Sequence, residues 1–194
     1  MKIGCVLLAA GAGKRFGGGK LLYEVQGEPM IAHALQLLGS IPFASRVCVA
    51  RRADRAIQTL AQEHGFAVVI NPDPERGVGT SVSIGTETVL LLERELDGIL
   101  YAVADQPYLT QASVKRLLDA FEQHPERIVS LSWQGKRGNP AIFPLDYWSE
   151  LMQLREDVGG AAVIRRHPES LLLVEADSAR ELEDLDTRNA EAKE

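Results

Sequence analysis

The sequence has 194 residues and a formal net charge of −6, with 45% hydrophobic and 25% charged residues. A chain of this length and composition can bury one hydrophobic core, so we expect a single domain over residues 1–194. The acidic balance argues against a general surface for nucleic acid or anionic membranes, because such surfaces are usually basic.

Short apolar runs alternate with helical patterns along the chain. The predicted strands are residues 2–10, 46–50, 66–71, 98–104, 127–132, 140–144 and 171–175. The predicted helices are residues 30–38, 53–64, 81–95, 111–122, 146–153 and 160–166. Because the strands are apolar throughout and alternate with helices, we expect an α/β sandwich with a mostly parallel sheet. Ligands then bind beyond the carboxyl ends of the strands.

The two cysteines, Cys5 and Cys48, lie in apolar runs and are interpreted as buried thiols in a reducing compartment. Cysteine and histidine spacings exclude a structural zinc site. The first apolar run superficially resembles a secretory signal, but it leads directly into a glycine-rich loop. No apolar stretch approaches the length of a membrane span. We therefore expect a cytoplasmic, unanchored protein.

The loop GAGKRFGGGK combines glycines with three cations, Lys14, Arg15 and Lys20. A Walker A loop is excluded twice, because Lys14 stands where its first glycine is needed and Leu21 where Ser or Thr holds magnesium. Three cations suit a ligand as anionic as a nucleoside triphosphate, with Arg15 gripping phosphate oxygens bidentately and Lys20 acting as a point charge. A solvated basic loop is the alternative.

The same loop is also a near miss of the dinucleotide fingerprint GxGxxG. Gly11 and Gly13 fit, but the third glycine comes one residue late, at Gly17. No acidic residue ends the second strand to bind a ribose hydroxyl, since Arg51 and Arg52 stand there instead. A dinucleotide is therefore the weaker hypothesis.

The spacing LAAGxxxRxGxxK resembles the signature of the MobA-like nucleotidyltransferase superfamily. That resemblance implies a Rossmann-like, three-layer α/β/α sandwich of the nucleotide-diphospho-sugar transferase type with a mostly parallel mixed sheet. It also implies that the loop binds the nucleotide and stabilises the leaving pyrophosphate. The loop residues implied in nucleotide binding are Leu8, Ala9, Ala10, Gly11, Gly13, Arg15 and Lys20, of which Arg15 and Lys20 are also expected to be catalytic.

Asp105 directly follows a buried strand, with Pro107 turning the chain away. A carboxylate at that edge can hold Mg²⁺, which prefers oxygen ligands. A helix cap is the alternative, although Thr110 is available for that purpose. The tetrapeptide ADQP is similar to the superfamily's xDxP motif, whose aspartate binds the metal.

A second metal ligand is expected in the segment EDLDT, at Asp186 or at Asp184. The segment resembles a DIDTPED-like ending of the superfamily, although Arg188 and Asn189 replace its Pro-Glu. An acidic surface turn is the alternative.

The segment NPDPERGVGTSVSIG resembles the nucleotide-lining NPxxxxGxxxS stretch of the cytidylyltransferase branch, which implicates Asn71, Gly79, Thr80 and Ser81. Amides and hydroxyls at a helix start can bind a base or a phosphate, or can simply cap the helix.

The segment QGKRGNPAIFP places Lys136 and Arg137 in a predicted loop before a strand. Two cations there suit a phosphorylated acceptor, and a solvated β-turn is the alternative. The segment resembles the superfamily motif GxxGHP, with Asn139 replacing the histidine. The acceptor-binding residues so implied are Lys136, Arg137, Gly138 and Asn139.

The resemblance extends to the cytidylyltransferase branch that acts on the molybdenum cofactor. It implies Mg²⁺-dependent transfer of CMP from CTP to the phosphate of molybdopterin, with release of pyrophosphate. The sequence LAAG, where the guanylyl branch more often has LAGG, favours CTP over GTP. The implied partners are the nucleotide, a phosphorylated small molecule, and a molybdoenzyme or its chaperone. The alternatives are transfer to a sugar phosphate or phospho-alcohol, a non-catalytic carrier of the cofactor, and nicotinamide-dependent oxidoreduction.

Overall fold

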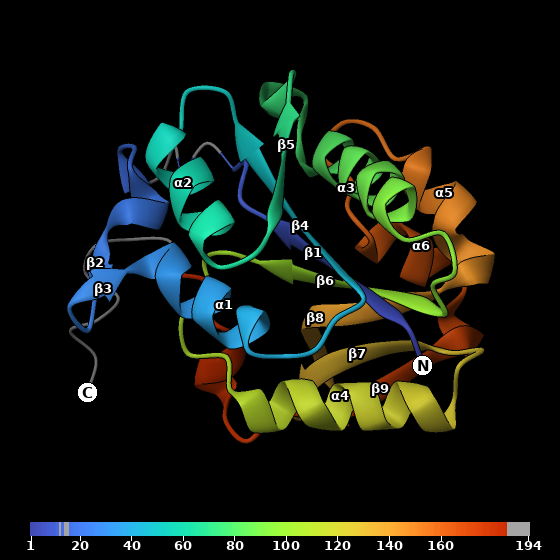
Figure 1. Cartoon of the computed structure of the whole chain (residues 1–194). Coiled ribbons are helices and arrows are strands. Elements are labelled where there is room, and N and C mark those ends of the chain that lie inside the picture. Colours follow the sequence, from blue (N-terminus) through green and yellow to red (C-terminus); the bar gives the residue numbers. More distant parts are fainter. Residues whose placement is uncertain (12, 14–15, 186–194) are drawn as a thin grey trace.

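The computed structural model describes residues 1–11, 13 and 16–185, and Figure 1 shows them as a central sheet between two layers of helices. Within those residues the main sheet has seven strands in the order β5-β4-β1-β6-β8-β7-β9. The strands are β1 (Ile3–Leu8), β4 (Ser45–Arg51), β5 (Ala67–Asn71), β6 (Gly98–Val103), β7 (Ile128–Trp133), β8 (Lys136–Pro144) and β9 (Leu171–Glu175). Only β8 runs antiparallel to its neighbours in this sheet.

Helices cover both faces of the sheet. They are α1 (Met30–Gly39), α2 (Arg55–Glu63), α3 (Val78–Leu92), α4 (Gln111–Gln123), α5 (Trp148–Met152) and α6 (Ala161–Arg166). Side chains of α1, α2 and α4 pack in one core cluster and those of α3, α5 and α6 in another. Along β1, Cys5 and Leu7 belong to the first cluster and Val6 to the second, so both faces of the strand are buried. This three-layer, mostly parallel arrangement confirms the predicted fold.

Helix α3 lies unusually close to the sheet because Gly85 has no side chain. A methyl group added at Gly85 would lie 2.5 Å from the Cγ1 atom of Val6 and 3.1 Å from Cγ2 of Val49. The close approach fixes α3 over β1 and β4. As a result, the beginning of α3 stands at the edge where those parallel strands end.

Two elements differ from the sequence-based expectation. Strand β8 begins at Lys136, four residues earlier than predicted, so Lys136 and Arg137 are paired with β7 and do not lie in a loop. The residues β2 (Glu24–Val25) and β3 (Glu28–Pro29) form a small hairpin that was not predicted. Strands of two residues are too short to show any periodicity, and only the turn, with positive φ angles at Gln26 and Gly27, marks the hairpin.

Both cysteines are free and buried, as expected. In the part of the chain that the structure describes, no helix is long and apolar enough to cross a membrane.

Candidate active site

A pocket of about 620 Å³ opens at the edge of the sheet where β1, β4 and β6 end. Its wall combines the glycine-rich loop, the end of β4, the turn before α3 and the end of β6. Seven residues predicted to bind nucleotide or metal line it: Leu8, Ala10, Gly11, Gly13, Lys20, Ser81 and Asp105. The structure therefore brings together loops that the parallel-sheet rule places at one edge.

The glycine-rich loop requires its glycines, because Gly17, Gly18 and Gly19 have φ angles of 81°, 91° and 66°. Side chains other than glycine rarely adopt such angles. The loop then enters the short 3₁₀ helix η2 (Lys20–Leu22), which begins with Lys20. The predicted catalytic residue Arg15 lies outside the described residues, whereas Ala9 is buried behind the pocket and donates its N–H to the Val49 carbonyl.

Lys20 and Asp105 form an ion pair at the centre of the pocket wall. The Lys20 Nζ atom lies 2.6 Å from Asp105 Oδ2, and the two side chains are only 10% and 25% exposed. The sequence assigned these residues to different tasks, a phosphate contact and a metal contact. The structure places the two side chains in direct contact, so the two expected functions concern the same point of the pocket wall.

The last described residues of the chain lie against residues 104–110, the loop between β6 and α4, here called the Asp105 loop. The Leu185 N–H donates to the Asp105 carbonyl over 3.1 Å. The Gln106 amide donates to Asp184 Oδ1 over 2.9 Å and to the Leu182 carbonyl over 3.1 Å. The segment that contains the expected second acidic ligand is thus anchored beside Asp105. Asp186 itself lies outside the described residues, so the choice between Asp184 and Asp186 stays open.

Asn71, Thr80 and Ser81 form a buried hydrogen-bond cluster at the start of α3. The Asn71 amide nitrogen donates to Thr80 Oγ1 and Ser81 Oγ, both over 2.9 Å. Thr80 in turn donates to the Gly77 carbonyl over 2.8 Å. These contacts join Asn71 to hydroxyls of the first turn of α3, but no side-chain hydrogen bond among the described residues caps the helix at its N-cap residue, Gly77. Among Asn71, Thr80 and Ser81, only Ser81 lines the pocket.

Gly79 faces a neighbouring loop instead of the pocket. Its N–H donates to the Glu156 carbonyl over 2.9 Å. A methyl group added at Gly79 would lie 2.7 Å from the Arg155 carbonyl oxygen. Gly79 therefore allows the 155–158 loop to approach α3, and this approach places Asp157 in the pocket wall.

The predicted acceptor residues lie at the beginning of β8, outside the lining of this pocket. Because β8 is antiparallel to β6, its start lies at the edge of the sheet where β6 ends. Arg137 is half-buried, and burial together with the neighbouring charge of Arg165 lowers the pKa of its guanidinium. Gly138 packs against the Leu182 side chain, where an added methyl group would come within 3.0 Å. Asn139 forms the cis peptide bond with Pro140.

Residues 5–171 match the family described as the MobA-like NTP transferase domain. The protein belongs to that family. The match confirms the family expected from the sequence motifs, and with it the expected class of enzyme, a nucleotidyltransferase.

Two curated proteins that are similar to this chain have names that describe different activities. Over 191 residues, the chain is 28% identical to a nicotine blue oxidoreductase of Paenarthrobacter nicotinovorans, covering 94% of this chain and 91% of that protein. Over 135 residues, it is 28% identical to a probable molybdenum cofactor guanylyltransferase of Thermococcus gammatolerans, covering 68% and 63% of the two chains.

Among solved structures, Rv0371c of Mycobacterium tuberculosis H37Rv has the same fold. It gives a TM-score of 0.80 at 23% identity, covering 96% of this chain and 93% of that one. The same protein in complex with manganese gives a TM-score of 0.72 at 21% identity, covering 91% and 90%.

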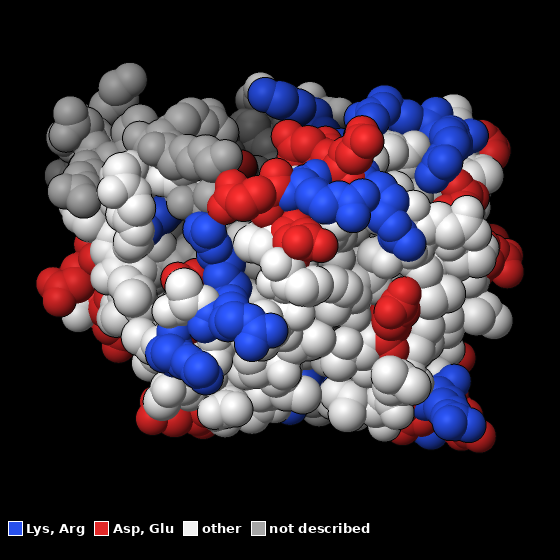
Figure 2. Space-filling model, turned by 90° about the horizontal axis from the view of Figure 1, so that it is seen from above, with Lys and Arg blue, Asp and Glu red and all other residues white. Residues whose placement is uncertain are grey.

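Several pocket residues of this MobA-like domain were not predicted from sequence as ligand-binding residues. They are Arg51, Asp54, Glu75, Arg76 and Asp157. Arg51 is the last residue of β4, so the rule that directed attention to Asp105 could have found it. It forms an ion pair with Glu75 over 2.8 Å. Figure 2 shows acidic and basic side chains mixed over the face seen from above. The cations available to an anionic ligand are therefore local and partly neutralised by carboxylates.

The acidic side chains of the MobA-like domain suit a metal ion shared with a nucleotide. Among the described residues, no three His, Cys, Asp or Glu side chains are grouped closely enough to hold a metal ion. Mg²⁺ commonly binds through one or two carboxylates, water and substrate phosphates instead. Asp105, which lines the pocket, and the neighbouring Asp184 fit that pattern.

Proposed function

We propose that this protein transfers CMP from CTP to the phosphate of a molybdopterin-type acceptor in a reaction that needs a divalent metal ion. The observation that carries the proposal is the contact between Lys20 and Asp105 in the wall of a pocket bounded by the glycine-rich loop. The Lys20 ammonium, which can bind phosphate oxygens, and the Asp105 carboxylate, which can bind a metal ion, lie within hydrogen-bond distance of each other. Nucleotidyl transfer needs both groups at that point.

The chemistry depends on position and charge. An anionic oxygen of the acceptor phosphate forms a bond to the α-phosphorus of CTP. The bond from that phosphorus to the bridging oxygen breaks, and pyrophosphate leaves with the bonding electrons. Lys20 stabilises the negative charge on the phosphates, and Arg15 is proposed to do the same. Asp105, with Asp184 or Asp186, would hold Mg²⁺, which supplies further charge neutralisation when bound. No protein nucleophile is needed.

The preference for CTP is proposed from Ala10. This residue lines the pocket at the position where the guanylyl branch more often has glycine. The manganese complex of Rv0371c supports a divalent metal in a protein of this fold. The guanylyltransferase names among the relatives make GTP the natural competitor.

The direct test measures pyrophosphate release from each nucleoside triphosphate, with molybdopterin cofactor and either Mg²⁺ or Mn²⁺. We expect release with CTP, and a loss of about a hundredfold or more in the Asp105→Asn variant. Release with GTP alone would preserve the reaction and overturn the base preference. An Asp105→Asn protein that retains full activity would refute the assignment of the metal.

A second candidate, nicotinamide-dependent reduction, rests on the oxidoreductase name of the relative that matches 94% of the chain. Arg51 lines the pocket at the end of β4, where a dinucleotide-binding fold can bind the 2′-phosphate of NADP. Binding of NADPH without metal, followed by dye reduction, would support this candidate. Competition between NADPH and CTP for one site would show that the two hypotheses concern the same pocket.

A further inference from the structure

Residues 177–185, here called the C-terminal arm, are joined by hydrogen bonds to the loop that contains Asp105. The arm contains the 3₁₀ helix η6 (Ala179–Leu182) and leads to Asp184. Its contacts with the loop after β6 join residues 71 to 78 positions apart in the sequence. Such an arm has little regular structure of its own, so specific side chains must fix its position.

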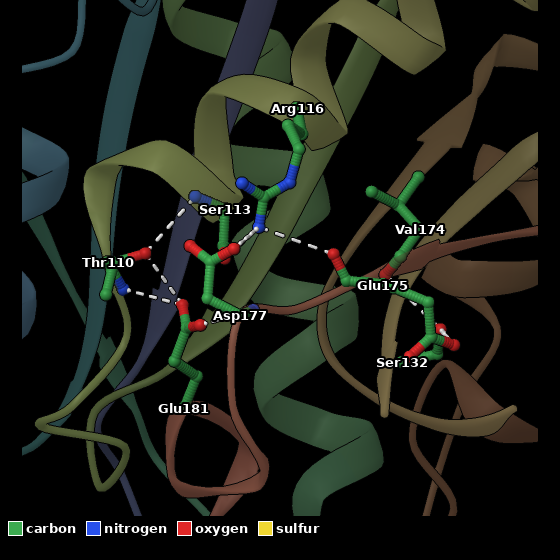
Figure 3. Close-up of polar contacts among 8 residues, drawn as sticks. All are labelled: Thr110, Ser113, Arg116, Ser132, Val174, Glu175, Asp177 and Glu181. Carbon is green, nitrogen blue, oxygen red and sulfur yellow. Dashed lines mark hydrogen bonds and ion pairs between the residues drawn. The ribbon is translucent and has the colours of Figure 1, made fainter. Parts of the chain in front are cut away.

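Glu181 is the principal anchor of the arm. It is 2% exposed, although it is a carboxylate. One of its oxygens accepts from the backbone N–H and the hydroxyl of Thr110, over 3.1 and 2.8 Å, and the other accepts from the Asp177 N–H over 2.8 Å. Figure 3 shows Glu181 pointing at Thr110, at the first turn of α4. A buried carboxylate at a helix N-terminus with three donors is well stabilised.

Thr110 links this anchor to the active site. Its hydroxyl oxygen caps α4 by accepting from the Ser113 N–H over 3.2 Å. It ends the loop that begins with Asp105 and Gln106, so Glu181 fixes one end of that loop. At the other end, the Gln106 amide binds Asp184 and the Leu182 carbonyl. The arm and the loop are thus fixed to each other at both ends.

We propose that Glu181 is a positioning residue for the metal site: by fixing the C-terminal arm to the α4 N-terminus, it holds Asp184 beside the loop that contains Asp105. Glu181 itself does not touch the ligand. The inference rests on the proposed function, because it assumes that Asp105 and an acidic residue of the EDLDT segment hold the metal.

Glu175, the last residue of β9, offers a control that matches Glu181 in its number of donors, although Glu175 is exposed. Its carboxylate also accepts three hydrogen bonds, from the Ser132 hydroxyl and from the N–H groups of Gln134 and Gly135, over 2.8, 2.8 and 3.1 Å. These contacts fix the β7–β8 turn and not the Asp105 loop. Glu175→Gln therefore removes a carboxylate with the same number of donors without loosening the arm.

The experiment titrates Mn²⁺ into the full chain in the presence of CTP with a non-hydrolysable α,β-methylene bridge, and follows free Mn²⁺ by electron paramagnetic resonance. We expect Glu181→Gln to weaken Mn²⁺ binding by about tenfold or more, as losses in the second shell of metal sites commonly do. Gln106→Ala should have a similar effect, and Glu175→Gln should bind as the wild type does. The dissociation constant of the nucleotide without metal should change little in any variant.

Circular dichroism establishes that each variant is folded, and Thr110→Val, which removes a hydroxyl that donates to Glu181, tests the same anchor if Glu181→Gln does not fold. Wild-type affinity in Glu181→Gln and Gln106→Ala would overturn the inference, as would an equal loss in Glu175→Gln. If the wild type binds Mn²⁺ with the nucleotide but releases no pyrophosphate with any acceptor, the proposed function fails, and the affinities of the variants still decide the inference. If the wild type binds no Mn²⁺ with the nucleotide, both fail.

Discussion

Replacing Lys20 by methionine should change metal binding and turnover in opposite directions. In the structure, the Lys20 ammonium contacts the carboxylate that we assign to the metal, at 2.6 Å. A divalent ion that binds without nucleotide must therefore displace it. A charged hydrogen bond of this kind contributes about 1.5–3 kcal/mol net. Because 1.4 kcal/mol corresponds to a factor of ten, we expect Lys20→Met to bind Mn²⁺ about 10 to 100 times more tightly in the absence of nucleotide.

With CTP and acceptor present, the same variant loses a cation that stabilises the phosphates. Removal of one such contact costs about 3 kcal/mol, so kcat/KM should fall by roughly a hundredfold. Mn²⁺ titration by electron paramagnetic resonance measures the first effect and pyrophosphate release the second. Lys115→Met, which removes an exposed lysine of α4 outside the pocket, is the control for net charge. Weaker Mn²⁺ binding by nucleotide-free Lys20→Met than by this control would refute the reasoning.

Three further predictions concern other parts of the molecule. Arg137→Ala should raise the KM for the acceptor about tenfold or more while leaving that for CTP unchanged, because loss of a charged hydrogen bond costs about 1.5–3 kcal/mol. An equal effect of Lys115→Ala, which removes an exposed cation of α4, would assign the effect to general charge. Burial alone would raise the pKa of Glu181, but hydrogen bonds from Ser113, Thr110 and Asp177 outweigh it, so the pKa is lowered. The stabilising effect of the ionised carboxylate is therefore present above the ordinary pKa of 4.5 and is lost as the pH falls through the folded-state pKa. The difference in free energy of unfolding between wild type and Glu181→Gln should therefore shrink from pH 7 to pH 3, and a constant difference would contradict the assignment. Burial raises the pKa of Cys48 to about 12 and that of Cys5 further, so a thiol reagent at pH 8 should label neither in the folded protein and both in denaturant.

The fold could be predicted because each strand of the sheet centre shows the same simple pattern. A strand such as β6 is apolar on both faces, and helices with one apolar face follow it. Once the sheet is known to be parallel, Asp105 must stand at its ligand edge, since it comes two residues after the end of β6. Lys20 was expected near the same edge, because the glycine-rich loop that follows β1 carries it.

Contacts between distant segments could not be predicted in this way. The first residues of β8 show no apolar alternation, so Lys136 and Arg137 were interpreted as a loop. Glu181 resembles any surface glutamate in the sequence, and only the folded chain shows the three donors around it. Asn71 was expected at the ligand, but its amide is engaged with the hydroxyls of Thr80 and Ser81. In each case the role of a polar side chain depends on the groups that the tertiary structure places next to it.

The pairing of β1 with β6 has a consequence for how the protein is made. Each opposed pair of residues, from Ile3 and Gly98 to Leu8 and Val103, is separated by 95 positions in the chain. At a synthesis rate of about 5–20 residues per second, the second strand appears roughly 5 to 20 s after the first. Until then, β1 can pair with β4 alone, and its other edge presents unpaired backbone groups to neighbouring chains. The yield of folded protein in a crowded cell therefore depends on what protects that edge while the ribosome completes the middle of the chain.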